Sequence, residues 1–174
     1  MTRARDILCD RLAAGATRDL GSTNEVAREA LHSPALVEQL VAALDDQRIV
    51  VPHRASNALK KIQRTNPALL TPFSKTILRK ALETKHLHTR WNLTILIGEL
   101  PLRGRDRSLA IDLMFEALSS RSALERVFAL QALANFAHND AALCKRIQPV
   151  LEKSLTDPSA SIRARARKLL KEIK

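Results

Sequence analysis

The chain has 174 residues, of which 45% are hydrophobic, so it is long and apolar enough to fold around a sizeable core rather than remain disordered. Aromatic residues make up only 3% and Gly occurs four times, which favours packed helices with a core of Leu, Ala, Ile and Val. The formal net charge of +11 favours a polyanionic partner, although Lys and Arg that merely solvate helix surfaces explain it equally well.

No stretch approaches the roughly 18 apolar residues that a membrane-spanning helix needs, so no membrane association is expected. Asp6, Asp10 and Arg11 interrupt any early apolar run that could serve as a signal peptide. Cys9 and Cys144 are far apart and each lies in a helical pattern, which is typical of unpaired thiols in a reducing compartment. These features together predict a cytoplasmic protein.

Residues 1–32 are expected to form a helix pair that caps a stack of further pairs. The segment "RDILCDRLA" is amphipathic, and Ser22 followed by Glu25 three residues later is the pattern of a capping box. A weaker match to the repeat pattern described next is typical of a terminal unit.

Four segments after residue 32 share one helical pattern. Leu44, Leu82, Leu118 and Leu155 occupy equivalent places, and an apolar residue precedes each by one helical turn. A second amphipathic pattern begins eight residues after each of these leucines. Its apolar positions are Ala55, Ala58, Leu59 and Ile62; Leu93, Leu96, Ile97 and Leu100; Ala129, Ala132, Leu133 and Phe136; and Ala166, Leu169, Leu170 and Ile173. The repeating unit is therefore helix, short turn, helix, with predicted repeats at 33–66, 67–102, 103–139 and 140–174.

This pattern resembles HEAT repeats, and the resemblance is strongest in the last repeat, where Leu155, Asp157, Ile162, Arg163 and Ala166 match the family signature. The resemblance implies an all-α fold: a right-handed α-α superhelix, or solenoid, of about five antiparallel helix pairs in a single domain, 1–174. It also implies a structural ladder of turn acids and helix arginines between neighbouring repeats. The residues in ladder positions are Asp46, Arg90, Arg126, Asp157 and Arg163.

By the same resemblance, the second helices line a concave face that binds partners. The helix sides opposite the predicted core present a stripe that is basic at both ends. Its candidate binding residues are His53, Lys60, Arg64, Trp91, Gln131, Lys168 and Lys171. Trp91 either fills space between neighbouring repeats, which is the favoured interpretation, or stacks against a ligand.

Two clusters of cations form a candidate basic patch. Arg103, Arg105 and Arg107 are expected on a loop, and Arg165, Arg167 and Lys174 lie in the C-terminal segment "SIRARARKLLKEIK". Such cations could follow a phosphate backbone by releasing its counterions. Single-strand binders usually interleave several aromatic residues with the cations, however, and here one Trp stands alone.

Catalytic and metal-binding patterns are weak. His86 and His88 have no third ligand nearby in the sequence and are expected to lie in a turn, and His32, His53 and His138 are expected to be isolated. A HEAT-like DNA glycosylase would pair a Trp with a carboxylate, but Glu99 lies about 12 Å along the helix from Trp91. No metal, cofactor or enzymatic activity is therefore expected.

The favoured function is non-enzymatic: a binding or scaffold protein that holds a protein or peptide on its concave face. The alternative is nucleic-acid binding, through the phosphate backbone, by the same basic groove. Glycosylase activity is a distant third hypothesis.

Overall fold

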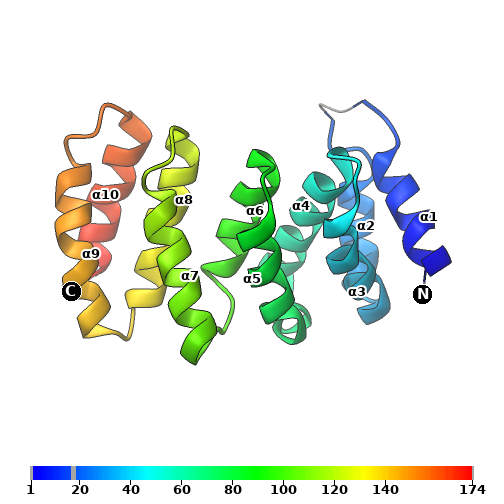
Figure 1. Cartoon of the computed structure of the whole chain (residues 1–174), viewed down its shortest axis with the longest axis horizontal. Coiled ribbons are helices and arrows are strands. Elements are labelled where there is room, and N and C mark those ends of the chain that lie inside the picture. The colour runs from blue at the N-terminus through cyan, green and yellow to red at the C-terminus, as the bar shows by residue number, and fades with distance from the viewer. Residues whose placement is uncertain (1, 17–18, 174) are drawn as a thin grey trace. The chain divides into compact units, whose positions relative to one another are not determined.

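The computed structural model describes residues 2–16 and 19–173, and all regular secondary structure within these ranges is helical (Figure 1). This agrees with the all-α prediction. No helix in the described ranges is long and apolar enough to cross a membrane. The chain divides into two compact units, Met1–Leu96 and Ile97–Lys174.

In the first unit, α4 is the central helix. The unit holds α1 (Thr2–Ala13), α2 (Thr23–Ala30), α3 (Pro34–Ala42), the 3-10 turn η1 (Ala43–Asp45), α4 (Val50–Thr65), the 3-10 helix η2 (Pro67–Phe73), α5 (Ser74–Glu83) and α6 (Leu87–Ile97), whose last residue begins the second unit. Helix α4 packs against α1, α2, α3, η1 and η2. The apolar stripe predicted for it, which includes Leu59 and Ile62, is fully buried.

In the second unit, α8 takes the central place. The unit holds α7 (Gly104–Ala117), α8 (Ala123–Ala137), α9 (Ala141–Ser154) and α10 (Ala160–Glu172). Helix α8 packs against α7, α9 and α10. Three alanines along α8, Ala129, Ala132 and Ala137, are almost completely buried, and their small side chains let neighbouring helices approach closely.

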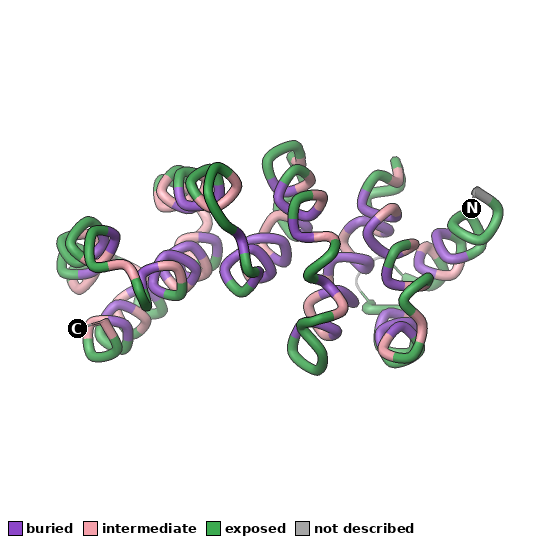
Figure 2. The backbone as a smooth tube through the Cα atoms, turned by 90° about the horizontal axis from the view of Figure 1, so that it is seen from below, coloured by how far each residue is buried: buried purple, intermediate pink, exposed green. Residues whose placement is uncertain are grey.

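The predicted core agrees closely with the observed burial, which Figure 2 shows along the helices of each unit. Thirteen of the sixteen apolar positions predicted in the second helices of the repeats are buried. Phe136, Leu170 and Ile173 are instead half-buried. Among the equivalent leucines of the first helices only Leu44 is buried: Leu118 and Leu155 are half-buried, and 47% of the Leu82 surface is exposed.

Helix starts follow elementary capping chemistry. Pro34 begins α3, and the Ser33 hydroxyl accepts a hydrogen bond from the Leu36 N–H at 3.3 Å. The capping box predicted at Ser22 is wrong in its hydrogen bonds, although Ser22 does precede α2. Its hydroxyl donates to the Arg11 carbonyl instead, and Glu25 lies 3.5 Å from the Arg11 guanidinium. Contacts to α1 therefore take the place of the local cap.

Candidate binding faces

The first unit brings three rings together on the side of α4 and α6 that the sequence predicts for binding. The His53 and His88 ring centroids are 5.2 Å apart, and the His88 ring meets the Trp91 ring edge-on at 4.8 Å. The expectation that His53 is isolated is therefore wrong. The sequence did carry a signal, because His53 and Trp91 hold equivalent positions in successive repeats and His88 lies one helical turn before Trp91.

The Trp91 side chain is half-buried, and its indole N–H is buried with no acceptor among the described residues. The ring contacts His88 of its own helix, and part of its surface still reaches solvent, so whether it fills space between repeats stays a prediction. Burial lowers the pKa of the His53 imidazole below its ordinary 6.5, and the nearby His88, Arg54 and Lys60 act in the same direction. These surroundings therefore favour the neutral form of His53.

A chain of hydrogen bonds continues this face along α4. The Lys60 ammonium donates to the Asn92 side-chain carbonyl at 2.8 Å, and the Asn92 amide donates to the Ser56 hydroxyl at 3.1 Å. Burial lowers the pKa of Lys60, and Arg64 and Lys61 add repulsion. Of the predicted residues on this face, Arg64 is the one fully exposed cation.

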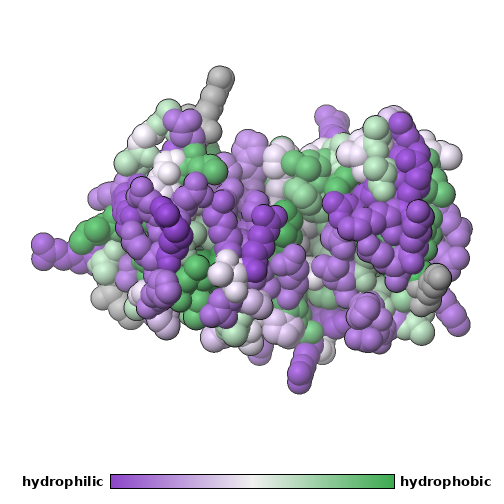
Figure 3. Space-filling view, turned by 180° about the vertical axis from the view of Figure 1, so that it is seen from behind, coloured by the Kyte–Doolittle hydropathy of each residue, from purple (hydrophilic) through white to green (hydrophobic). Residues whose placement is uncertain are grey.

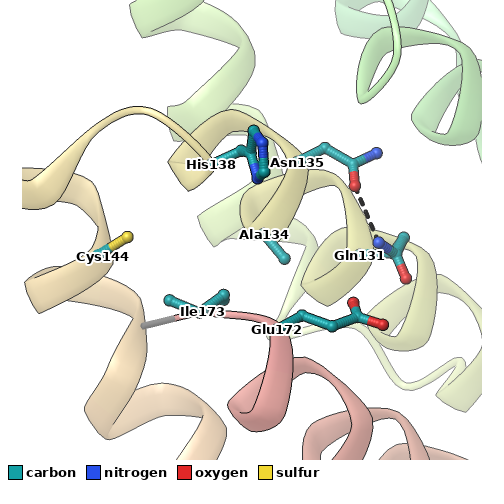
Figure 4. A pocket seen from close by; sticks show the side chains of 7 residues that line it. All are labelled: Gln131, Ala134, Asn135, His138, Cys144, Glu172 and Ile173. Carbon is teal, nitrogen blue, oxygen red and sulfur yellow. Dashed lines mark hydrogen bonds between the residues drawn. The ribbon is translucent and has the colours of Figure 1, made fainter.

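The second unit holds a pocket of about 300 Å³ at the ends of α8 and α10, where they meet the start of α9 (Figure 4). Its lining residues are Gln131, Ala134, Asn135, His138, Cys144, Glu172 and Ile173. Gln131, Ala134 and His138 are spaced along α8 on the side opposite its predicted core, so the pocket lies on the predicted binding side of this helix.

Polar side chains of the pocket are already tied to one another and to neighbouring cations. The Gln131 amide donates to the Asn135 side-chain carbonyl at 2.8 Å, and the Arg165 guanidinium donates to the Gln131 carbonyl oxygen. The Lys168 ammonium lies 3.6 Å from a Glu172 carboxylate oxygen. Two predicted cations of α10 therefore stand at the pocket rim.

Other predicted cations of α10 are fully solvated. Arg167 and Lys171 are exposed, and hydrophilic side chains cover most of the surface seen at the C-terminal end of the chain in Figure 3. Lys174 lies outside the described residues.

The prediction that Arg103, Arg105 and Arg107 lie on a loop is wrong for the last two, because α7 begins at Gly104, whose φ is +52°. Arg103 and Arg105 are exposed there, as a basic patch requires. Arg107 is instead half-buried and makes hydrogen bonds within the unit: its guanidinium donates to the Phe136 carbonyl at 2.7 Å and to the Asp140 carboxylate at 2.8 Å.

Residues in ladder positions hold turns and helix starts together. Arg126 donates to the Ser120 carbonyl at 2.7 Å and reaches Asp157, in the next predicted repeat, at 3.4 Å. Arg163 donates to the Asp157 carbonyl at 2.7 Å. Asp46 instead accepts from Arg48 at 2.9 Å, and this ion pair holds the pKa of Asp46 well below its usual range. Arg90 is half-buried near the start of α6.

Sequence reasoning missed Arg54, the largest fully buried side chain of the described residues. Its guanidinium donates to backbone carbonyls of residues 12, 14, 16 and 19 over 2.5 to 3.1 Å, between α1 and α2. A Cβ at Gly21, whose φ is +49°, would lie 2.9 Å from the Arg54 Nη1. Arg54 thus fixes the connection between the first two helices.

Within the described ranges, no group of three or more His, Cys, Asp or Glu side chains could hold a metal ion. A comparison with models of known protein families finds no match to the chain, and a comparison with curated proteins finds none either.

Proposed function

We propose that this chain is a non-enzymatic binding protein that holds a protein or peptide partner on the exposed sides of the second helices of its repeats. The observation that carries this proposal is the pocket of about 300 Å³ on the outward side of α8. Its volume is at the lower end of the range for ligand pockets and suits one or two side chains of a peptide. Helix pairs that stack in this way offer extended surfaces for such partners.

The same proposal includes the architecture implied by the resemblance. We propose that the helix pairs continue as one right-handed solenoid of HEAT type, with the ladder arginines at the turns. The contact between Arg126 and Asp157, which joins two successive predicted repeats, supports this arrangement.

Nucleic-acid binding is the second candidate, and the α4–α6 face favours it. Rings of His53, His88 and Trp91 lie beside Lys60 on that face, and Arg64 follows one turn further along α4. Aromatic rings next to cations can stack bases and neutralise phosphates. This candidate predicts binding that weakens steeply with salt.

The main proposal can be tested with a substitution that fills the pocket. Peptides that bind the full chain are selected from a random 12-residue library, and their affinities are measured by fluorescence polarisation. Because the Ala134 side chain faces the pocket, Ala134→Leu should weaken selected peptides by at least about tenfold, which is a loss of about 1.4 kcal/mol. Ala164→Leu, an exposed alanine on α10, should leave binding unchanged.

Two results would contradict the proposal. One is a library that yields no peptide while single-stranded DNA or RNA shifts in a gel at low salt. The other is equal weakening by Ala134→Leu and Ala164→Leu. Far-UV circular dichroism of both variants checks that the helices are retained.

A further inference from the structure

The outward side of α10 is a cationic surface next to the pocket. Ile162, Ala166 and Leu169 are buried on the opposite side of this helix. Arg167, Lys168 and Lys171 project from the solvent side, and Glu172 is the one acidic residue in the helix. Three cations against one carboxylate leave this side of α10 with a net positive charge.

Two cations of α10, Arg165 and Lys168, are joined to the pocket by contacts within the second unit. Arg165 donates to Gln131, and Lys168 pairs with Glu172 at 3.6 Å, so each cation touches a residue that lines the pocket. Side chains of Lys168 and Glu172 are 64% and 49% exposed, so this ion pair is weak and an incoming carboxylate can compete for the ammonium. The rim therefore presents positive charge that is available to a ligand.

The pocket itself is small, and Glu172, which is paired with Lys168, is the one carboxylate in its lining. Ala134 and Ile173 supply apolar surface, and the Gln131 and Asn135 amides supply neutral polar groups. A pocket of about 300 Å³ beside cations suits an uncharged side chain that is flanked by acidic ones.

Aromatic residues of the second unit argue against nucleic acid at this surface. Phe115 and Phe136 are half-buried, and each faces a guanidinium: Arg146 lies 4.9 Å from the Phe115 ring centroid, and Arg107 lies 5.9 Å from that of Phe136. Neither of them lines the pocket, and neither does Phe128, which is also half-buried. The His138 imidazole is therefore the one ring in the pocket lining, whereas single-strand binders usually stack successive bases on several aromatic side chains.

From this arrangement we infer that the partner segment bound at the α8–α10 pocket is an acidic peptide, with one uncharged side chain in the pocket and Asp or Glu on either side of it. Arg165, Lys168 and Lys171 receive the carboxylates. This inference rests on the proposed function and specifies the partner at the same pocket.

The experiment uses the full chain and four fluorescein-labelled probes. One is an 11-residue peptide of Glu and Asp with a central Leu, one has Ser in place of this Leu, one has Lys in place of every acid, and one is a 12-nucleotide oligothymidylate. Affinities are measured by fluorescence polarisation at low and moderate salt. We expect the acidic Leu peptide to bind most tightly, with the Ser peptide several-fold weaker.

Two double variants distinguish binding at the α8–α10 pocket from attraction by the net charge of the whole chain. Lys168→Glu with Lys171→Glu should weaken the acidic peptide by at least tenfold. The matched control, Arg79→Glu with Lys85→Glu, changes the net charge equally at exposed positions of the first unit that belong to no candidate binding face, and it should weaken binding by less than threefold.

Equal weakening by the two double variants would overturn the inference, because net charge alone would then explain binding. Tightest binding of the oligothymidylate or of the Lys peptide would overturn it as well. If library-selected peptides bind the pocket but are not acidic, this inference fails while the proposed function stands. If no peptide binds in either experiment, both fail.

Discussion

At the residue scale, Arg54 is a buried cation whose guanidinium donates to four backbone carbonyls. A guanidinium carries five N–H donors in a fixed planar arrangement, and four carbonyls between α1 and α2 receive them. Three of these carbonyls lie in the connection after α1, where no helical ladder pairs them, and Arg54 supplies each with a donor. The Ala16 carbonyl also accepts from the Asp19 N–H at 3.1 Å. A single side chain thereby couples α4 to the first helix pair.

We predict that Arg54→Met destabilises the first unit by about 3–5 kcal/mol, because it removes charged donors from buried carbonyl acceptors. Urea unfolding followed by Trp91 fluorescence measures this loss in the first unit. Arg64→Met, at an exposed position of the same helix, should change stability by less than about 0.5 kcal/mol. A loss below about 1 kcal/mol for Arg54→Met would mean that solvent or other donors satisfy these carbonyls.

Periodicity in the sequence predicted which side of each helix is buried, but not which residues meet across helices. Spacing of 3.6 residues fixes the direction of a side chain around its own axis, and this sufficed for Leu59 or Leu133. The partners of Arg54 lie more than 30 residues earlier, in a connection whose backbone path the pattern does not specify. The contact between His53 and His88 was also missed, although the equivalent positions of His53 and Trp91 in successive repeats were a signal for it.

At the scale of elements, Asp140 joins three helices of the second unit. Its carboxylate caps α9 by accepting from the Leu143 N–H at 2.9 Å, and it also accepts from Arg107 of α7 at 2.8 Å. Arg107 in turn donates to the last turn of α8 at Phe136. The Leu143 N–H foremost, and then Arg107, hold the pKa of Asp140 below its ordinary 3.8.

The lowered pKa of Asp140 gives a prediction with a definite sign. A carboxylate that is more acidic in the folded protein stabilises it above pH 3.8, and this stabilisation is lost as the pH falls through the lower folded value. Asp140→Asn keeps a capping side chain but removes the charge. The variant should therefore be less stable than the wild type at neutral pH, and the difference should shrink on acidification below 3.8.

Far-UV circular dichroism during urea unfolding, repeated at neutral and acid pH, follows this difference. Asp112→Asn, which removes an exposed carboxylate from the middle of α7, is the matched control and should show a smaller pH dependence. If the difference in unfolding free energy between wild type and Asp140→Asn stayed constant across the acid range, the stabilising role of the Asp140 charge would be contradicted.

Capping explains where prediction from the sequence held and where it did not. At Pro34 the signal is local: Pro lacks the N–H that would be unpaired at a helix start, and the preceding Ser33 caps the helix, so α3 can begin here without contacts from another helix. At Ser22 a local pattern was equally good, but Arg11 of α1 supplied competing partners for both the hydroxyl and Glu25. Tertiary contacts thus override a capping box when a neighbouring helix offers a carbonyl and a guanidinium.

At the scale of the whole molecule, positive charge is spread over both units. Residues 1–96 hold fifteen Lys and Arg against nine Asp and Glu, and residues 97–174 hold fourteen against nine. Net charge therefore steers anionic partners toward the whole chain but does not locate a site. The contacts of Arg165 and Lys168 with residues that line the α8–α10 pocket do locate one, and the sequence could place these residues on one side of their helices without revealing the pocket.

The division into two units predicts how the chain unfolds. Because Trp91 is the only Trp and lies in the first unit, its fluorescence follows that unit, while circular dichroism follows the helices of both. Leu59→Ala and Leu133→Ala each remove a fully or almost fully buried side chain, one per unit, and should cost about 2–5 kcal/mol locally. Leu59→Ala should lower the urea midpoint of Trp fluorescence. Leu133→Ala should leave that midpoint in place and shift only part of the circular dichroism transition, whereas equal shifts of both signals in both variants would show that the chain unfolds as one cooperative body.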